Sequence, residues 1–280
     1  MCKPLAVRGV EIGANQPKIV VSVAEKCYKD VLEKAEVLRE MRIKSKKRID
    51  HEMWIDREKQ IDIVEWRADF YEDIFNIDRT INLLSDLRII LKDIPLLFTF
   101  RTKEEGGVRQ ISMEDYTELN VFAAKSGKVD FVDVEMFSGD DVVAKNIKAL
   151  HEAGVFVIGS HHDFQSTPPK DVLVDRLRRM QSMGADILKI AVMPNSMEDV
   201  LTLLAATHEM YETYADRPIV TISMSRKGLI SRISGEVFGS AMTFGVVGQP
   251  SAPGQIPVMD LAQVLNLLHR FSSVNGQGRS

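Results

Sequence analysis

The sequence predicts an α/β protein in which eight parallel strands close into a (β/α)₈ barrel, a TIM barrel. The chain has 280 residues, the usual length of one such barrel. Short runs rich in β-branched residues recur about once per 35 residues (280/8), and several intervals between them show helical periodicity. Alternating strands and helices build a parallel sheet. An open doubly wound sheet is the alternative, but no G-x-G-x-x-G fingerprint follows the first run.

The expected strands are apolar runs of strand length. In chain order they are Lys18–Ala24, Ile61–Arg67, Leu96–Arg101, Asp130–Glu135, Val155–Ser160, Asp186–Val192, Ile219–Met224 and Met242–Gly248. Residues Leu5–Ile12 precede them and predict a small hairpin that closes the bottom of the barrel. We therefore expect one domain over residues 1–280, with the hairpin in residues 1–16 and a frayed polar tail at residues 272–280.

Helix signals lie between these runs. Apolar residues at helical spacing follow Pro168-Pro169, and Gly184 is a plausible stop for that helix. Ser196 is a plausible N-cap for the next helix. The first interval is the longest, and its charged stretch, residues 44–60, should lie on the helix-to-strand side, away from the active end of a barrel. Acidic residues follow its basic part at once, which favours a solvated helix end over a nucleic-acid or targeting patch.

Composition excludes several classes of function. The 36 basic and 40 acidic residues give a net charge of −4, which argues against binding nucleic acid through bulk charge. The two cysteines, Cys2 and Cys27, form neither a disulfide framework nor a metal cluster. No apolar run reaches membrane-spanning length, and the first residues lack the core of a signal peptide. We expect a soluble, cytoplasmic enzyme that does not act on a membrane.

Charged residues occur inside the expected strands, which is the most informative feature of the sequence. Side chains alternate between the two faces of a strand, and the outer face of a barrel must be apolar because helices cover it. The charged positions should therefore point into the lumen, near the C-terminal ends of the strands, where barrel enzymes have their active sites. They are Glu65, Arg67, Arg101, Asp133, Glu135 and Lys189. These groups must neutralise one another or a ligand, and a purely structural ion-pair network is the alternative interpretation.

Lys189 is the strongest single indication of chemistry. It lies in the middle of the run ADILKIAVMP, between apolar neighbours. Burial and nearby cations disfavour the charged form of an amine. An uncharged amine in a dry pocket can attack a carbonyl group and form a Schiff base. A lysine that is only paired, or that reaches toward solvent, is the alternative.

The loops after the strands add candidate groups. His161 and His162 end the fifth run, a position suited to proton transfer, and we expect at most one of them to face the site. They also allow a metal interpretation, but no His/Cys cluster occurs elsewhere. Two loops could hold an anion: the one containing Gly106-Gly107, and the one containing Arg232, which is near a helix start and has the better charge. Ser251 and Gln255, after the eighth run, could form a polar lid.

Taken together, these motifs resemble the type I 3-dehydroquinate dehydratases, Schiff-base lyases of the shikimate pathway of aromatic amino acid biosynthesis. The matching segments, in the order of the family, are EWRADF at 65–70, FTFRTKEEGG at 98–107, HDF with TP at 162–168, ADILKIAVMP at 185–194, GLISRISGEVFGSAMTFG at 228–245 and SAPGQI at 251–256. Each motif alone is weak, but their joint occurrence over nearly the whole chain is highly specific.

The resemblance implies roles for individual residues. Lys189 matches the Schiff-base lysine, His162 the general acid/base, and Glu105 the carboxylate that pairs with this histidine. The positions that match the substrate-binding group are Ser22, Glu65, Trp66, Arg67, Arg101, Met224, Arg232, Ser251 and Gln255. Within this group, the acidic residue and the two arginines of the early strands match residues around the ring hydroxyls of the substrate. The members of the family are typically homodimers and use no metal or organic cofactor.

The resemblance also implies a reaction, the syn elimination of water from 3-dehydroquinate through a lysine imine. A class I aldolase and a catalytically silent binding module are the alternatives. Three features depart from the pattern of the family: the long connection at 44–60, Ile222 where some relatives carry methionine, and the added positive charge of Arg226-Lys227.

Overall fold

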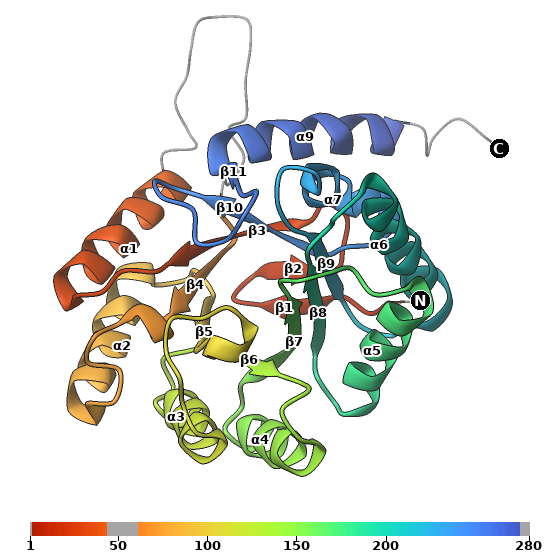
Figure 1. The fold of residues 1–280 in the computed structure, drawn as a ribbon. Helices are drawn as coiled ribbons and strands as arrows, with labels where there is room; N and C mark the ends of the chain where they lie inside the picture. Colours follow the sequence, from red (N-terminus) through yellow and green to blue (C-terminus); the bar gives the residue numbers. More distant parts are fainter. Residues whose placement is uncertain (1, 44–60, 275–280) are drawn as a thin grey trace, which may run out of the picture.

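The computed structural model describes residues 2–43 and 61–274, which form a (β/α)₈ barrel (Figure 1). Eight parallel strands surround the axis: β3 (Lys18–Val23), β4 (Ile63–Arg67), β5 (Leu96–Thr99), β6 (Phe131–Glu135), β7 (Phe156–Asp163), β8 (Ile187–Val192), β9 (Ile219–Ser223) and β10 (Met242–Val246). Each coincides with one expected run, within a few residues at its ends. The barrel interpretation is therefore confirmed, and the open doubly wound sheet is wrong.

The helices cover the outside of the barrel (Figure 1). They are α1 (Tyr28–Ile43), α2 (Ile77–Leu91), α3 (Met113–Lys125), α4 (Asp140–Glu152), α5 (Lys170–Ser182), α6 (Met197–Glu209), α7 (Leu229–Ile233), α8 (Gly235–Phe238) and α9 (Val258–Val274). Short turns η1 (Ala68–Phe70) and η2 (Lys103–Glu105) follow β4 and β5, and η3 (Met210–Tyr214) extends α6. Ser196 caps α6 through a capping box with Asp199, as its position before an apolar stripe predicts.

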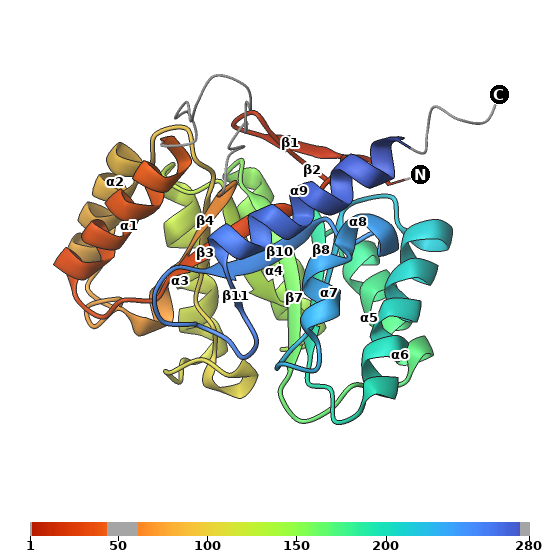
Figure 2. The same cartoon turned by 90° about the horizontal axis from the view of Figure 1, so that it is seen from above.

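The hairpin is also confirmed. β1 (Leu5–Val7) and β2 (Val10–Ile12) pair antiparallel, and Figure 2 shows them at one end of the barrel. Their side chains Val7, Val10 and Ile12 pack into the lumen cluster. Arg8 fixes the hairpin to this end, because its Nε lies 2.6 Å from Asp130, directly before β6. The hairpin therefore closes the end of the barrel at which the strands begin.

Two apolar clusters follow from the alternation of the strands. The outer cluster lies between the strands and the helices and includes Val64, Trp66 and Leu188. The inner cluster fills the lumen and includes Ile63, Phe131 and Ile187. Neighbouring residues of one strand thus belong to different clusters, as a period of two requires. This arrangement leaves the C-terminal part of the lumen for polar side chains.

The barrel closes between β9 and β10 by side chains rather than by a full ladder. Among the described residues, one isolated bridge joins Ile219 of β9 to Ser240, which lies two residues before β10. Ala241 N donates to Ile219 O at 2.7 Å, and Thr221 N donates to Ser240 Oγ at 3.1 Å. The Ser240 hydroxyl group therefore satisfies a backbone amide that a ladder would otherwise pair. The sequence pattern did not predict this closure between β9 and β10, because a serine next to a strand indicates only a loop.

The charged connection at 44–60 lies outside the described residues, and so do residues 275–280 of the expected tail. The part of that tail that is described continues α9 to Val274. Among the described residues, no helix has the length and apolar character that crossing a membrane requires.

Candidate active site

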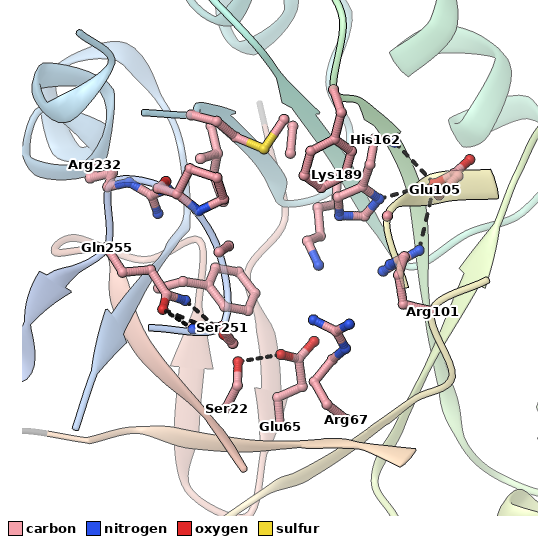
Figure 3. Close-up of a pocket in the computed structure, with 18 residues that line it drawn as sticks. Ser22, Glu65, Arg67, Arg101, Glu105, His162, Lys189, Arg232, Ser251 and Gln255 are labelled. Atoms are coloured by element: carbon pink, nitrogen blue, oxygen red, sulfur yellow. Dashed lines mark hydrogen bonds and ion pairs between the residues drawn. The ribbon is translucent and has the colours of Figure 1, made fainter. Parts of the chain in front are cut away.

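The charged residues of the strands meet in one pocket at the C-terminal end of the lumen (Figure 3). The cavity has a volume of about 250 Å³. Its charged lining consists of Glu65, Arg67, Arg101, Glu105, Lys189 and Arg232, together with His162. The strand alternation therefore predicted correctly which charged side chains face the lumen. Asp133 and Glu135 lie behind this lining and contact its cations.

Lys189 lies in the middle of β8, is 4% exposed, and extends its amine into the pocket (Figure 3). Nζ is 3.3 Å from Asp133 Oδ2 and 4.6 Å from the centre of the Phe244 ring. Carboxylates and aromatic faces are both partners of a protonated amine. The uncharged amine expected from the sequence stays a prediction. The two contacts are of the kind that stabilises a positive charge on this nitrogen.

Arg101 is the centre of the ion-pair network. Its guanidinium lies 2.9 Å from Asp133, 2.9 Å from Glu135 and 3.5 Å from Glu105. Burial opposes the charge of Arg101, but these carboxylates outweigh it and raise the pKa of the guanidinium. Burial likewise acts to raise the pKa of Asp133, but Arg101 and Lys189 hold that pKa well below its ordinary range. The network keeps both kinds of charge in the lumen at neutral pH.

Glu105 connects two histidines. Its Oε2 is 3.0 Å from His162 Nδ1 and also accepts from the His162 backbone N–H at 3.0 Å, and its Oε1 is 3.1 Å from His161 Nδ1. Burial would raise the pKa of Glu105, but hydrogen bonds from the two histidines and the charge of Arg101 lower it to about 2. The carboxylate is ionised and can only accept hydrogen bonds. Both Nδ1 atoms must therefore carry the proton.

His162 is thereby prepared to act as a base. Burial, together with the charge of Arg101, lowers the pKa of His162 to about 3, so its ring is neutral at physiological pH. With the proton on Nδ1, the lone pair lies on Nε2. His162 lines the pocket and His161 does not, which confirms that only one of them faces the site.

Glu65 and Arg67 are held in fixed positions at the side of the pocket formed by β4. Ser22 and Thr99 donate hydrogen bonds to the two carboxylate oxygens of Glu65, at 2.5 and 2.9 Å. Arg67 makes a bidentate pair with Asp69, at 2.8 and 2.9 Å. Asp69 is fully buried and also accepts from the backbone N–H groups of Arg101 and Val108, at 3.4 and 3.3 Å. It therefore orients Arg67 and fixes the segment that carries Glu105.

The opposite side of the pocket has the character of an anion site. Arg232 is 2% exposed, and within the described part of the chain no carboxylate pairs with it. Its Nη2 donates to Pro253 O at 2.9 Å, while its buried Nε has no hydrogen-bond partner there. Burial lowers the pKa of Arg232 to about 10, so it stays charged. Ser251 and Gln255 bond to each other and line the same side (Figure 3).

Trp66 corrects one expectation. The resemblance placed it among the substrate-binding residues, but its ring lies in the outer cluster, 5.9 Å from the Tyr71 ring and 5.6 Å from the Phe98 ring. It is fully buried and is not part of the pocket lining. The strand period explains the difference, because Trp66 lies between two lumen residues. The other positions of the substrate-binding group line the pocket, Met224 included.

The structure also places the two loops that could hold an anion. Gly106 (φ +87°) lines the pocket and packs against Phe164, and a Cβ there would lie 2.3 Å from its ring. Arg232 lies in the short helix α7, in agreement with its expected position near a helix start. The loop cation Lys227 does not line the pocket, and its amine donates to Asn195 O at 2.6 Å. Ile222 does line the pocket, as its strand position implies.

Two residues near the site had no assigned role in the sequence interpretation. Asp69 lies within the EWRADF segment, but its contact with Arg67 depends on the turn η1. His161 was set aside because it lies on the other face of β7, yet Glu105 spans the strand end and bonds to both histidines. Neither contact follows from spacing alone. Among the described residues, no group of three or more His, Cys, Asp or Glu side chains could hold a metal ion.

Comparisons with known proteins show the family of this chain. The sequence profile of the family described as type I 3-dehydroquinase matches residues 40–272. The 3-dehydroquinate dehydratase of Clostridioides difficile (strain 630) is 46% identical over 270 residues, which cover 96% of this chain and 99% of that protein. The 3-dehydroquinate dehydratase of Salmonella typhimurium (strain LT2) is 47% identical over 268 residues, with the same coverage.

Solved structures of 3-dehydroquinate dehydratases are also similar to this chain. The type I 3-dehydroquinate dehydratase from Clostridium difficile with covalently modified comenic acid has a TM-score of 0.87 at 46% identity, covering 97% of this chain and all of that one. The 3-dehydroquinate dehydratase from Geobacillus kaustophilus also has a TM-score of 0.87, at 37% identity, covering 96% and 98%. A 3-hexulose-6-phosphate synthase has a TM-score of 0.55 at 14% identity, which shows only a shared fold. The full-length matches show that this chain belongs to the type I 3-dehydroquinase family.

Proposed function

We propose a role for each side of this pocket in the dehydration of 3-dehydroquinate to 3-dehydroshikimate. The chain is a lyase of the shikimate pathway of aromatic amino acid biosynthesis, and the type I reaction runs through a lysine Schiff base. Lys189 is the amine, His162 moves the protons, Glu105 orients His162, and the remaining charged groups hold the substrate. The single observation that carries this assignment is the Lys189 amine, buried in the lumen of a pocket that also contains a neutral histidine.

The first step joins Lys189 to the C3 ketone of the substrate. The amine gives up a proton, attacks the carbonyl carbon, and water leaves as the iminium forms. His162 is the neutral base that lines the same pocket and can accept that proton. It returns the proton to the hydroxyl group that leaves as water, so it is neutral again for the second step. The iminium keeps the positive charge that the amine had. The Asp133 carboxylate and the Phe244 ring therefore stabilise the intermediate as they stabilise the ammonium.

The second step is the elimination itself. The iminium withdraws electrons and acidifies the C2 proton, which His162 removes through Nε2. The resulting enamine expels the C1 hydroxyl group, and the proton on Nε2 converts this group to water. One imidazole serves both transfers, so the elimination is syn. Hydrolysis of the imine then releases 3-dehydroshikimate and restores Lys189.

The two sides of the pocket suit the two ends of the substrate. Glu65, Arg67 and Arg101 offer acceptors and donors for the ring hydroxyl groups. Arg232 supplies the buried cation that lacks a carboxylate partner among the described residues, and Ser251 and Gln255 add neutral polar groups beside it. A substrate carboxylate can therefore neutralise Arg232 without breaking an existing ion pair. Ser22 and Met224 complete the binding group.

A turnover assay tests the proposal directly. Loss of water creates a conjugated enone, so incubation with 3-dehydroquinate should raise ultraviolet absorbance. The Lys189→Ala variant should give no increase, while its thermal unfolding stays close to that of the wild type. Aldol cleavage, the reaction of the alternative class I aldolase, would give fragments without the enone. Absence of turnover in the folded wild-type protein would contradict the assignment, and so would full activity of the variant.

We also propose that the chain is a cytoplasmic homodimer. Helix α8 packs against both α6 and α7, and these helices expose large apolar side chains, including Leu201 at 63% and Val237 at 62%. Exposed apolar groups on adjoining helices are typical of a subunit interface, and a second copy of the chain is the occupant that fits the homodimers of the family. Sedimentation equilibrium should give twice the mass of the chain. The double variant with Leu201→Glu and Val237→Glu should have the mass of a single chain. A wild-type monomer would contradict the proposal.

A further inference from the structure

His161 shares a carboxylate with the histidine that faces the pocket. The two residues are neighbours on β7, so their side chains leave opposite faces of the strand. Glu105 lies across the end of this strand and uses one oxygen for each ring, Oε1 for His161 at 3.1 Å and Oε2 for His162 at 3.0 Å. His161 is the one partner of Oε1 among the described residues.

The other contacts of this carboxylate among the described residues are all made by Oε2, which accepts from the backbone N–H and from Nδ1 of His162 and lies 3.5 Å from Arg101 Nη1. The terminal torsion of a glutamate side chain has a broad minimum, so a carboxylate held through one oxygen alone can still rotate. Rotation would take Oε2 away from His162 Nδ1. A hydrogen bond to Oε1 restricts that rotation because both oxygens then have fixed donors. His161 therefore acts on the geometry of His162 through Glu105.

His161 is itself held by packing. Its ring makes an edge contact with Phe137, with ring centres 4.9 Å apart. Arg176 and Arg179 lie over the Phe137 ring, at 5.8 and 5.3 Å from its centre. The imidazole is thus part of a packed stack that reaches from α5 to the strand end. Such support is what a group that positions another group requires.

We infer that His161 is a positioning residue for proton transfer. It donates from Nδ1 to Glu105 Oε1, which keeps Oε2 on Nδ1 of His162 and leaves Nε2 of His162 facing the substrate. The inference rests on the proposed roles of His162 and Glu105. His161 does not line the pocket, so its loss should slow the chemical step and leave substrate binding almost unchanged.

Two substitutions separate a donor from other roles. His161→Leu removes the donor and keeps an apolar side chain against Phe137. His161→Asn replaces the imidazole by an amide whose N–H group can reach the same oxygen. His151→Leu is the matched control, because His151 Nε2 is also paired with a carboxylate, Asp186 Oδ2 at 2.9 Å, but at the opposite end of the strands.

Steady-state kinetics with 3-dehydroquinate should then show a clear order. We expect His161→Leu to lower kcat about tenfold or more, less than the ~10²- to 10⁴-fold contribution of a complete general acid/base, with KM within about twofold. His161→Asn should restore kcat to within about threefold of the wild type, and His151→Leu should match the wild type. With substrate deuterated at C2, His161→Leu should show a larger isotope effect on kcat, since proton removal limits the rate more.

Other results would overturn the inference. An unchanged kcat in His161→Leu would show that Oε1 needs no partner. Equal losses in His161→Leu and His161→Asn would show that donation to Glu105 is not the role. Equal losses in His161→Leu and His151→Leu, with lowered thermal midpoints, would show a merely structural effect. Borohydride reduction in the presence of substrate distinguishes a failure of this inference from a failure of the proposed function. An adduct on Lys189 in His161→Leu supports the inference, because the imine still forms. If the wild type gives no adduct, the proposed function is wrong and the inference is wrong with it.

Discussion

The two ends of the barrel lumen are built from the same strands but from opposite kinds of side chain. On β8, Ile187 belongs to the apolar cluster near the end where the strands begin, and Lys189, two residues later on the same face, lies in the pocket. On β4 the same step leads from Ile63 to Glu65. The alternation of side chains along a strand thus decides which face a residue occupies. The position of the residue along the strand decides whether it contributes to the apolar core or to the active site.

The difference between the ends also explains how the charged end is tolerated. An apolar lumen residue gains free energy by leaving water, whereas a buried charge costs several kcal/mol unless it is paired. At the charged end the cost is offset by a network, in which Arg101 contacts three carboxylates and Asp133 contacts both Arg101 and Lys189. The hairpin side chains Val7, Val10 and Ile12 close the other end. Stability and activity should therefore respond to different substitutions.

The largest effect should come from the charged end. Lys189→Met removes the amine and keeps the length and apolar stem of the side chain. We expect kcat to fall by at least about 10⁴-fold, since the nucleophile is lost and no second lysine lines the pocket among the described residues. Asp133 keeps its contacts with Arg101 and Ser160, so the fold should remain. Turnover measured by enone absorbance, with thermal unfolding as the control, checks this. Activity within tenfold of the wild type would refute the assignment of the amine.

The matched substitution at the apolar end is Ile187→Ala. It leaves a cavity in the lumen and should lower the free energy of unfolding by about 2–5 kcal/mol. The pocket residues are unaltered, so kcat should stay within about threefold of the wild type. Denaturant unfolding and steady-state kinetics measure the two quantities on one sample. A large loss of kcat without a loss of stability would show that the two ends are not separable in this way.

A smaller effect should appear in the pH dependence of stability. The pKa of His162 is about 3 in the folded protein and has its ordinary value of 6.5 when unfolded. The unfolded chain therefore takes up this proton first, and stability is lost as the pH falls from 6.5 toward 3. Between pH 6.5 and 4.5 the loss should be about 2 kcal/mol. Glu105, whose pKa is about 2 instead of 4.5, adds to the loss only at lower pH.

His162→Asn provides the comparison for that pH effect. Its free energy of unfolding should vary less between pH 6.5 and 4.5 than that of the wild type, measured by denaturant titration at each pH. If the free energy of unfolding changed equally with pH in the two proteins, His162 would not be held neutral by burial.

The smallest effect is expected outside the pocket. Lys227 lies in the loop after β9, where its amine bonds to Asn195 O. Lys227→Met should change the free energy of unfolding by less than about 0.5 kcal/mol, since the group is exposed, and kcat/KM by less than about twofold. Kinetics at low and high salt check whether this charge attracts the anionic substrate. A tenfold rise in KM would place Lys227 within the functional site.

Much of this arrangement follows from the sequence, because a strand period of two is visible in it. The charges at Glu65, Arg67, Arg101 and Lys189 could be assigned to the lumen for that reason alone. The same rule places Trp66 on the outer face, and the structure agrees with the rule rather than with the role carried over for that residue. For this residue, the face predicted from the strand period was therefore more reliable than the role carried over from the family motif.

Other features could not be predicted, for two physical reasons. Contacts made by turns depend on backbone geometry, as in the pair between Arg67 and Asp69 across η1. Contacts between distant segments depend on how the loops fold over the barrel, and 56 residues separate Glu105 from His161. The contacts of Lys189 with Asp133 and Phe244 belong to the same class, because they join different strands of the barrel.

The most direct test of the central claim is the mass of the protein after reduction with borohydride in the presence of 3-dehydroquinate. A covalent carbon–nitrogen bond between Lys189 and the substrate skeleton should appear, and peptide mapping should place the added mass on that residue. Continued turnover with Lys189 unmodified, or the adduct on a different lysine, would contradict the account.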